Sequence, residues 1–311
     1  MKFSFEIWPN DPYPGDTTVG VCTNSWGDRP IEWCVDRVAE AGYQGVDFFF
    51  DRFLELPSSE FDRLAATLGG YVKSKGMEVA SIGAHHLLLT PRPWDRAERV
   101  VITKRAIDLA AMIDARTVAA YIAGYYNPPT YKLMSRREAN DAIVDMIREC
   151  AEYAGERGLT FSIEPHQETF INTPAATLEV IDRVALENVR VTLDFGGVEL
   201  GMKPFMSVAD AFKSFAGLLN HVHAKDITGV TGRWNMCWFG GGLVDFAAYA
   251  RALKDIGYSD YVCVEWEGWF NGGLLGCGDI AEPGLADMDR VAVEALEFLG
   301  PHFGRDSALA S

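Results

Sequence analysis

Residues 159–170 read LTFSIEPHQETF, an apolar run that ends at the carboxylate of Glu164 and is followed, one proline later, by His166. The run has the apolar and β-branched residues of a buried strand, and Gly158 before it is typical of a helix end. Seven further runs of this kind occur along the chain. They lie at 18–24, 45–50, 77–83, 117–123, 189–194, 219–226 and 261–267.

Amphipathic segments rich in Ala, Leu, Glu and Arg separate these runs, for example SSEFDRLAATLGGYVKSKG at 58–76. Strands that alternate with helices predict a parallel sheet with helical crossovers. Eight such units within 311 residues favour a closed (β/α)8 barrel over an open sheet. No G-x-G-x-x-G sequence follows the first run, which counts against a dinucleotide-binding fold. We therefore predict an α/β fold of the TIM barrel type.

The same pattern sets the expected domain limits. One barrel domain would extend over residues 18–300, after an N-terminal extension at 1–17 and before a tail at 301–311. No linker-like stretch separates the chain into two halves, so we expect a single domain.

The composition argues against several classes of partner. A formal net charge of −16 repels nucleic acid and anionic lipid, since both are bound through cationic residues. No segment approaches the length of about 20 apolar residues that crosses a membrane. The N-terminal sequence lacks a secretory signal, so we expect a cytoplasmic protein. The six cysteines are scattered without a C-x-x-C pair, which indicates reduced, mostly buried thiols rather than a disulfide or zinc framework.

Four consecutive predicted strands end in groups that can bind a divalent cation. These are Glu164, Asp194, the pair His221 and His223, and Glu265. The carboxyl ends of barrel strands meet at one mouth, where three carboxylates would repel one another unless a cation neutralised them. The donor set suits Mn²⁺ first, with Mg²⁺, Co²⁺ or Zn²⁺ as alternatives. The residues alone leave open whether His221 or His223 is the ligand, and any one of them could instead be a solvated loop residue or a hydrogen-bonded core histidine.

Several short sequences resemble those of the xylose-isomerase-like TIM barrels. They are EP at 164–165, LD at 193–194, HVHAKD at 221–226, FGGGLVDF at 239–246 and GYSDYVCVEWE at 257–267. That superfamily includes sugar-phosphate isomerases and epimerases, ketose 3-epimerases, inosose dehydratases and endonuclease IV. Within it, the EPH sequence is similar to the large subunit of bacterial C-glycoside deglycosidases.

The resemblance implies a metal quartet in this chain. Its members are Glu164, Asp194, His223 and Glu265. Gly197 and Phe170 stand where relatives of the epimerase and endonuclease types carry a histidine and a second glutamate, and Gly229 stands where epimerases carry a substrate-binding arginine. These departures count against endonuclease chemistry and against the substrate contacts of a free-ketose epimerase.

A catalytic base is expected beside the metal site. A metal-bound carbonyl makes the neighbouring C–H more acidic, and an imidazole is well matched to remove that proton at neutral pH. His166 is the candidate base, with orientation of a carboxylate as the alternative role. Glu265 is a second candidate that would act both as ligand and as proton carrier. The candidate substrate-binding residues are His85, His86, His221, Lys225, Arg233, Trp266 and Glu267.

These residues predict a metal-dependent enzyme that deprotonates a keto-sugar. The leading hypothesis is a lyase that cleaves 3-keto-glycosides, and the alternative is a keto-sugar isomerase, epimerase or inosose-type dehydratase. A non-catalytic sugar-binding subunit is a third possibility. The expected ligand is a small sugar or glycoside. We expect a homo-oligomer, or a hetero-oligomer with a small second subunit, for which the aromatic, Gly-rich loop at 234–242 is a candidate contact or lid.

Overall fold

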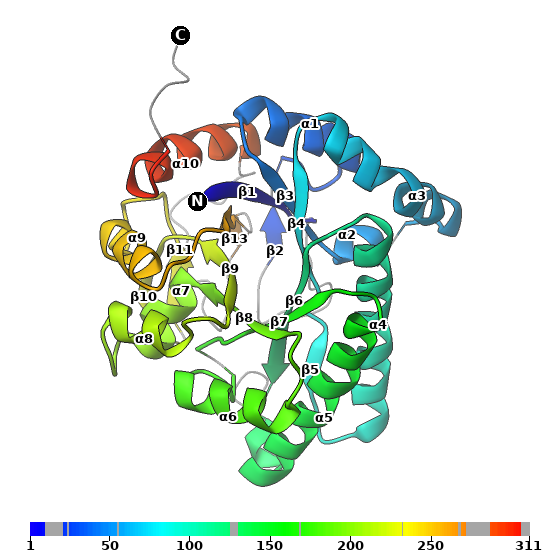
Figure 1. Ribbon diagram of the computed structural model, residues 1–311, viewed down its shortest axis with the longest axis vertical. Helices are drawn as coiled ribbons and strands as arrows, with labels where there is room; N and C mark the ends of the chain where they lie inside the picture. Colours follow the sequence, from blue (N-terminus) through cyan, green and yellow to red (C-terminus); the bar gives the residue numbers. More distant parts are fainter. Residues whose placement is uncertain are drawn as a thin grey trace.

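The computed structural model describes residues 1–9, 21–23, 25–54, 56–124, 130–167, 169–231, 233–266, 269–271 and 287–305. Its centre is a ring of parallel strands surrounded by helices (Figure 1). In chain order the ring strands are β1 (Lys2–Ile7), β3 (Gly45–Phe49), β4 (Glu78–Gly83), β6 (Thr117–Gly124), β7 (Thr160–Glu164), β8 (Val189–Asp194), β9 (Leu219–Ala224) and β12 (Tyr261–Val264). Each pairs with the next, and β12 pairs with β1, so the ring closes. The predicted (β/α)8 barrel is confirmed.

Helices lie on the outside of the ring (Figure 1). They are α1 (Ile31–Ala41), α2 (Asp51–Leu54), α3 (Ser58–Ser74), α4 (Pro93–Met112), α5 (Arg136–Gly155), α6 (Pro174–Val184), α7 (Phe195–Gly197), α8 (Val208–Ser214), α9 (Phe246–Asp255) and α10 (Met288–His302), with short turns η1 (Thr130–Lys132) and η2 (Val198–Met202). At the start of α5, Ser135 and Glu138 form a reciprocal capping box. None of the described helices is long and apolar enough to cross a membrane.

Several short strands are not members of the closed ring. β5 (Leu87–Leu89) extends β6, β10 (Ile227–Val230) and β11 (Arg233–Met236) form a hairpin after β9, and β2 (Val21–Thr23) pairs with β13 (Trp269–Asn271). The prediction that 18–24 is the first barrel strand, with 1–17 outside the barrel, was therefore wrong. Lys2–Ile7 closes the ring between β3 and β12.

The alternation of β1 explains this correction. Phe3 and Phe5 pack outside the ring, where their rings contact Phe303 and Tyr43 respectively. Ser4 and Glu6 occupy the intervening positions and are also buried. Successive side chains of a strand point to opposite faces, so one face of this strand is apolar and the other is polar. A buried strand with a polar face does not look like the continuous apolar run expected of a parallel sheet.

The interior of the barrel is polar rather than apolar. Its buried polar side chains include Ser4, Glu6, Asp47, Ser81, Thr117, Ser162, Thr192 and His221. Near the base, Ser162 donates a hydrogen bond to Asn220 Oδ1 at 2.9 Å, and Asn220 donates to Thr117 at 3.1 Å. A register shift between β8 and β9 accompanies this contact, with Leu219 opposite Val191 and His221 opposite Thr192. The ring therefore encloses hydrogen-bonding groups from its base to its mouth.

Asp226, directly after β9, fixes the Gly-rich loop. Its carboxylate accepts hydrogen bonds from the backbone N–H groups of Ile227, Gly240, Gly242 and Val244 at 2.9–3.2 Å. Gly242 approaches so closely that a Cβ there would lie 2.2 Å from Asp226 Oδ1. The part of the loop expected to act as a lid is thus anchored to the barrel through one buried carboxylate.

Candidate metal centre at the carboxyl ends of the strands

The predicted ligands come from four adjacent strands. Glu164 ends β7, Asp194 ends β8, His223 lies in β9 and Glu265 follows β12, and all four are buried. His223 Nδ1 lies 3.3 Å from Glu164 Oε1 and 3.4 Å from Glu265 Oε2. One donor atom from each of these three residues lies within 4.8 Å of the others, a spacing that allows a shared cation.

Asp194 joins the centre through Lys225. Both oxygens of Asp194 accept hydrogen bonds from backbone N–H groups, of Gly196 and Gly197, at 2.9 Å. Lys225 Nζ lies 3.3 Å from Asp194 Oδ2 and 3.1 Å from Glu265 Oε1. The structure thus brings Glu164, His223 and Glu265 into one donor group and holds Asp194 beside it through an ammonium group.

The charges of these buried groups are strongly coupled. Burial alone would raise the pKa of Glu164, but the neighbouring His223 outweighs it and holds that pKa well below its usual range. Burial would lower the pKa of His223, yet Glu164 and Glu265 raise it well above its ordinary value. Burial raises the pKa of Asp194 against the opposing effect of Lys225. Without a metal, the protonated imidazole of His223 therefore supplies the positive charge between the carboxylates of Glu164 and Glu265.

A second group of residues adjoins the centre. His85, in the loop after β4, was predicted to contact the substrate, whereas Glu6 and Trp8, at and just after the end of β1, were missed. Trp8 Nε1 donates a hydrogen bond to Glu6 Oε2 at 2.6 Å, and the Trp8 ring stacks on Phe49 with centroids 4.0 Å apart. His85 Nε2 lies 3.8 Å from Glu164 Oε2. Burial raises the pKa of Glu6 to about 8 and lowers that of His85 to about 3. Glu6 and Trp8 could have been found from the apolar–polar alternation of KFSFEIW at 2–8.

His166 lies beside the aromatic ring of Tyr121, with ring centroids 4.9 Å apart. Its side chain is half-buried, and its Nδ1 is buried without a hydrogen-bond partner among the residues described. Burial lowers the pKa of His166 to about 3, so the imidazole is neutral near pH 7. A neutral imidazole with an uncommitted nitrogen can accept a proton.

The other residues that were predicted to contact the substrate lie in different places in the structure. His86 lies 3.1 Å from Asp51 at the start of α2, and His221 lies 2.8 Å from Asp47 inside the ring. Trp266 is fully buried and packs against Trp238, with centroids 5.1 Å apart. Glu267 lies outside the described residues, as does the side chain of Arg233.

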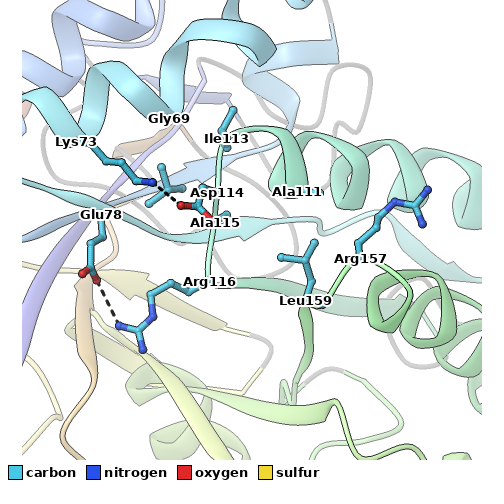
Figure 2. Close-up of a pocket in the computed structure, with 12 residues that line it drawn as sticks. Gly69, Lys73, Glu78, Ala111, Ile113, Asp114, Ala115, Arg116, Arg157 and Leu159 are labelled. Atoms are coloured by element: carbon cyan, nitrogen blue, oxygen red, sulfur yellow. Dashed lines mark hydrogen bonds and ion pairs between the residues drawn. The ribbon is translucent and has the colours of Figure 1, made fainter.

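A cleft of about 670 Å³ lies at the other end of the barrel (Figure 2). Its walls include Glu78 at the start of β4, together with Arg116 and Leu159 directly before β6 and β7. Lys73 pairs with Asp114 at 2.5 Å across it. This cleft is at the amino-terminal ends of the strands, so it is separate from the metal centre.

Comparisons with known proteins agree with this geometry. The chain is 29% identical to inosose isomerase of Bacillus subtilis (strain 168) over 140 residues, which are 44% of this chain and 50% of that protein. This match thus spans half the length of the relative. The fold resembles that of D-psicose 3-epimerase in the presence of D-fructose, with a TM-score of 0.72, 21% identity, and coverage of 98% of this chain and 100% of that one.

A structure of the protein IolI with a bound zinc atom is similar over 98% of this chain and 100% of that one, with a TM-score of 0.70 and 18% identity. The model of the family described as the xylose isomerase-like TIM barrel matches residues 35–301, which are most of the chain. The protein therefore belongs to the xylose isomerase-like TIM barrel family.

Proposed function

We propose that this protein is a divalent-metal-dependent isomerase or epimerase of a keto-sugar or a related cyclic ketone. The observation that carries the proposal is the buried donor group of Glu164, His223 and Glu265 at the barrel mouth. Relatives named as an inosose isomerase and a D-psicose 3-epimerase support this chemistry. They favour it over the lyase that the sequence analysis placed first.

The residues present fit a divalent cation. Glu164 Oε2 is buried and has no hydrogen-bond partner within the described chain, as expected of an oxygen reserved for a ligand. A donor set of carboxylate oxygens and one imidazole suits Mn²⁺, and Mg²⁺, Co²⁺ and Zn²⁺ remain alternatives. Bound there, the ion would act as a Lewis acid toward the substrate carbonyl and make the neighbouring C–H more acidic.

The surrounding side chains supply orientation and proton transfer. Glu164 and Glu265 both lie within 3.4 Å of His223 Nδ1 at the barrel mouth, so each could pass a proton to or from a sugar carbon bound there. Lys225 holds Glu265 in place. Trp8, stacked on Phe49, gives the site an apolar wall on which a sugar ring can pack.

One observation favours the lyase as a second candidate. The buried Nδ1 of His166 has no hydrogen-bond partner among the described residues, so this nitrogen could accept a proton taken from the carbon α to a ketone. After that abstraction, a glycoside with a leaving group at the β carbon would eliminate it, whereas a free ketose would be reprotonated. Release of an aglycone distinguishes the lyase from the isomerase, which conserves the mass of its substrate.

The proposal is tested by metal analysis together with hydrogen exchange. The native protein, Glu164→Gln and the control Glu199→Gln would be loaded with Mn²⁺, desalted and analysed for metal. Glu199 is also a buried glutamate, but it pairs with Lys203 at 2.7 Å. Each protein would then be incubated with ketoses and inososes in ²H₂O.

We expect about one ion per chain and deuterium incorporation next to the carbonyl in the native protein and Glu199→Gln. Both should be lost in Glu164→Gln. A native protein that retains no divalent ion, or a Glu164→Gln variant that exchanges at the native rate, would contradict the proposal.

A further inference from the structure

A second group of donor atoms lies deeper in the barrel than the proposed catalytic centre. Asp47 from β3, His221 and His223 from β9 and Cys263 from β12 are all 0–1% exposed. One donor atom from each of the four lies within 4.8 Å of the other three. Cys263 precedes Glu265 by two residues on the same face of its strand, so this group forms the next layer below the mouth.

Asp47 carries a buried oxygen, Oδ1, that no described residue binds. His221 Nε2 lies 2.8 Å from Asp47 Oδ2, yet neither atom takes part in a hydrogen bond among the described residues. Asp47 Oδ1 has no hydrogen-bond partner there either. Buried polar atoms are nearly always bonded, because burial without a partner forfeits their hydration. Asp47 Oδ2 and His221 are close enough to form an ion pair, whereas the unbonded Oδ1 leaves a buried carboxylate oxygen available to a cation.

We propose that Asp47, His221, His223 and Cys263 bind a second metal ion, of the Zn²⁺ type, inside the barrel. One carboxylate, two imidazoles and one thiolate are ligands that zinc and cobalt accept in tetrahedral sites. On binding, the thiol of Cys263 and the imidazolium of His223 each release a proton to solvent, so that the ion meets a thiolate and neutral imidazoles. The thiolate and the Asp47 carboxylate then balance the two positive charges of the ion, so the buried site is neutral.

The two centres differ in chemistry although they share His223. The donors particular to the mouth are carboxylates, which suit a harder ion such as Mn²⁺, whereas the deeper group adds a sulfur and a further imidazole. Asp47, His221 and Cys263 belong only to the deeper group, and Glu164 belongs only to the mouth. Substitutions at these residues can therefore separate the two sites.

The test uses the full-length protein, stripped of metal with a chelator and titrated with Co²⁺. A cobalt–thiolate bond gives a near-ultraviolet charge-transfer band, which the donors at the mouth cannot produce because they contain no sulfur. We expect this band in the native protein, in Glu164→Gln, and in the control Cys150→Ser, whose buried thiol lies on α5. Cys263→Ser should lose the band, and His221→Gln should lose or weaken it at equal cobalt.

Absence of the band in native protein that binds cobalt would overturn the deeper site, as would a band that persists in Cys263→Ser. The native measurement decides even if a variant fails to fold. The result is independent of the proposed function, because loss of exchange in Glu164→Gln with an intact band implicates the mouth alone. Catalysis without any sulfur–cobalt band would remove the deeper site and leave the isomerase proposal standing.

Discussion

Lys225 Nζ lies 3.1 Å from Glu265 Oε1, so a lysine ammonium bonds directly to a proposed metal ligand inside the barrel mouth. The same nitrogen lies 3.3 Å from Asp194 Oδ2. Lys225 thus links the carboxylates of Asp194 and Glu265 and supplies part of the positive charge that they require. Its contribution should be greatest when no metal ion is present.

Lys225→Met should destabilise the metal-free protein by about 3–5 kcal/mol, because it leaves buried carboxylates without their partner. Mn²⁺ should restore part of this loss, since the ion neutralises the same oxygens. Urea denaturation with and without Mn²⁺ measures both effects. The control is Lys104→Met, which breaks an exposed pair with Glu149 at 2.7 Å and should change stability by less than about 1 kcal/mol. Equal losses for the two variants would contradict the role assigned to Lys225.

His166→Asn should lower turnover by about 10²–10⁴-fold if this imidazole is the base, while the bound metal is retained. The comparison is made on whichever ketose or 3-keto-glycoside the native protein converts, with metal content measured on the same samples. Loss of the ion in His166→Asn would instead assign the residue to the support of Glu164. Native turnover in the variant would assign proton transfer to Glu164 and Glu265.

The raised pKa of Glu6 predicts how the stability of the metal-free protein depends on pH. The carboxyl titrates near its ordinary 4.5 in the unfolded chain and near 8 in the fold. Between these values the Glu6 carboxyl is protonated in the folded protein and ionised in the unfolded chain, so its own contribution to stability falls as the pH rises from 5 to 8. Glu6→Gln should flatten this dependence and be the more stable protein at pH 8. Urea denaturation in chelator across this range tests it, and an unchanged slope in Glu6→Gln would refute it.

Gly242→Ala should destabilise the protein, because the added Cβ would lie 2.2 Å from Asp226 Oδ1 and 2.4 Å from the backbone oxygen of Ile227. Displacement of this backbone would break hydrogen bonds to a buried carboxylate, each worth about 1.5–3 kcal/mol. The neighbouring Gly241→Ala is the control, since its Cβ would meet one backbone oxygen, of Trp238, at 3.1 Å. Thermal denaturation compares them, and a Gly242→Ala variant as stable as Gly241→Ala would show that the loop adapts.

The barrel fold and the candidate ligands at its mouth could be predicted from the sequence, because both follow from where the strands end. Runs such as TFSIE and VRVTLD are buried and regular, so their last residues, Glu164 and Asp194, could be placed at one edge without knowledge of packing. β1 was not predicted as a barrel strand, because Ser4 and Glu6 on its inward face give it the alternating pattern of a strand with one exposed face. The mistake removed Glu6 and Trp8 from the predicted site.

The deeper group could not be found in the same way. The cysteines lack the short spacings of a zinc framework, and Asp47, His221 and Cys263 meet only after the ring closes. Their proximity depends on the register of strands that are far apart in the sequence. His86 shows the opposite case, since its neighbour His85 faces Glu164 while His86 itself turns to Asp51.

The closure of the ring by β1 and β12 also constrains how the protein is made. Phe5 pairs with Val264, so the ring strand that is synthesised first, β1, has as one of its partners the ring strand that is synthesised last, β12. Until residue 264 has emerged, the segment KFSFEI carries an unpaired backbone edge and exposed aromatic side chains. The ring therefore cannot close before β12 has emerged, and Glu265 can take its place at the mouth only after this last strand has joined the ring.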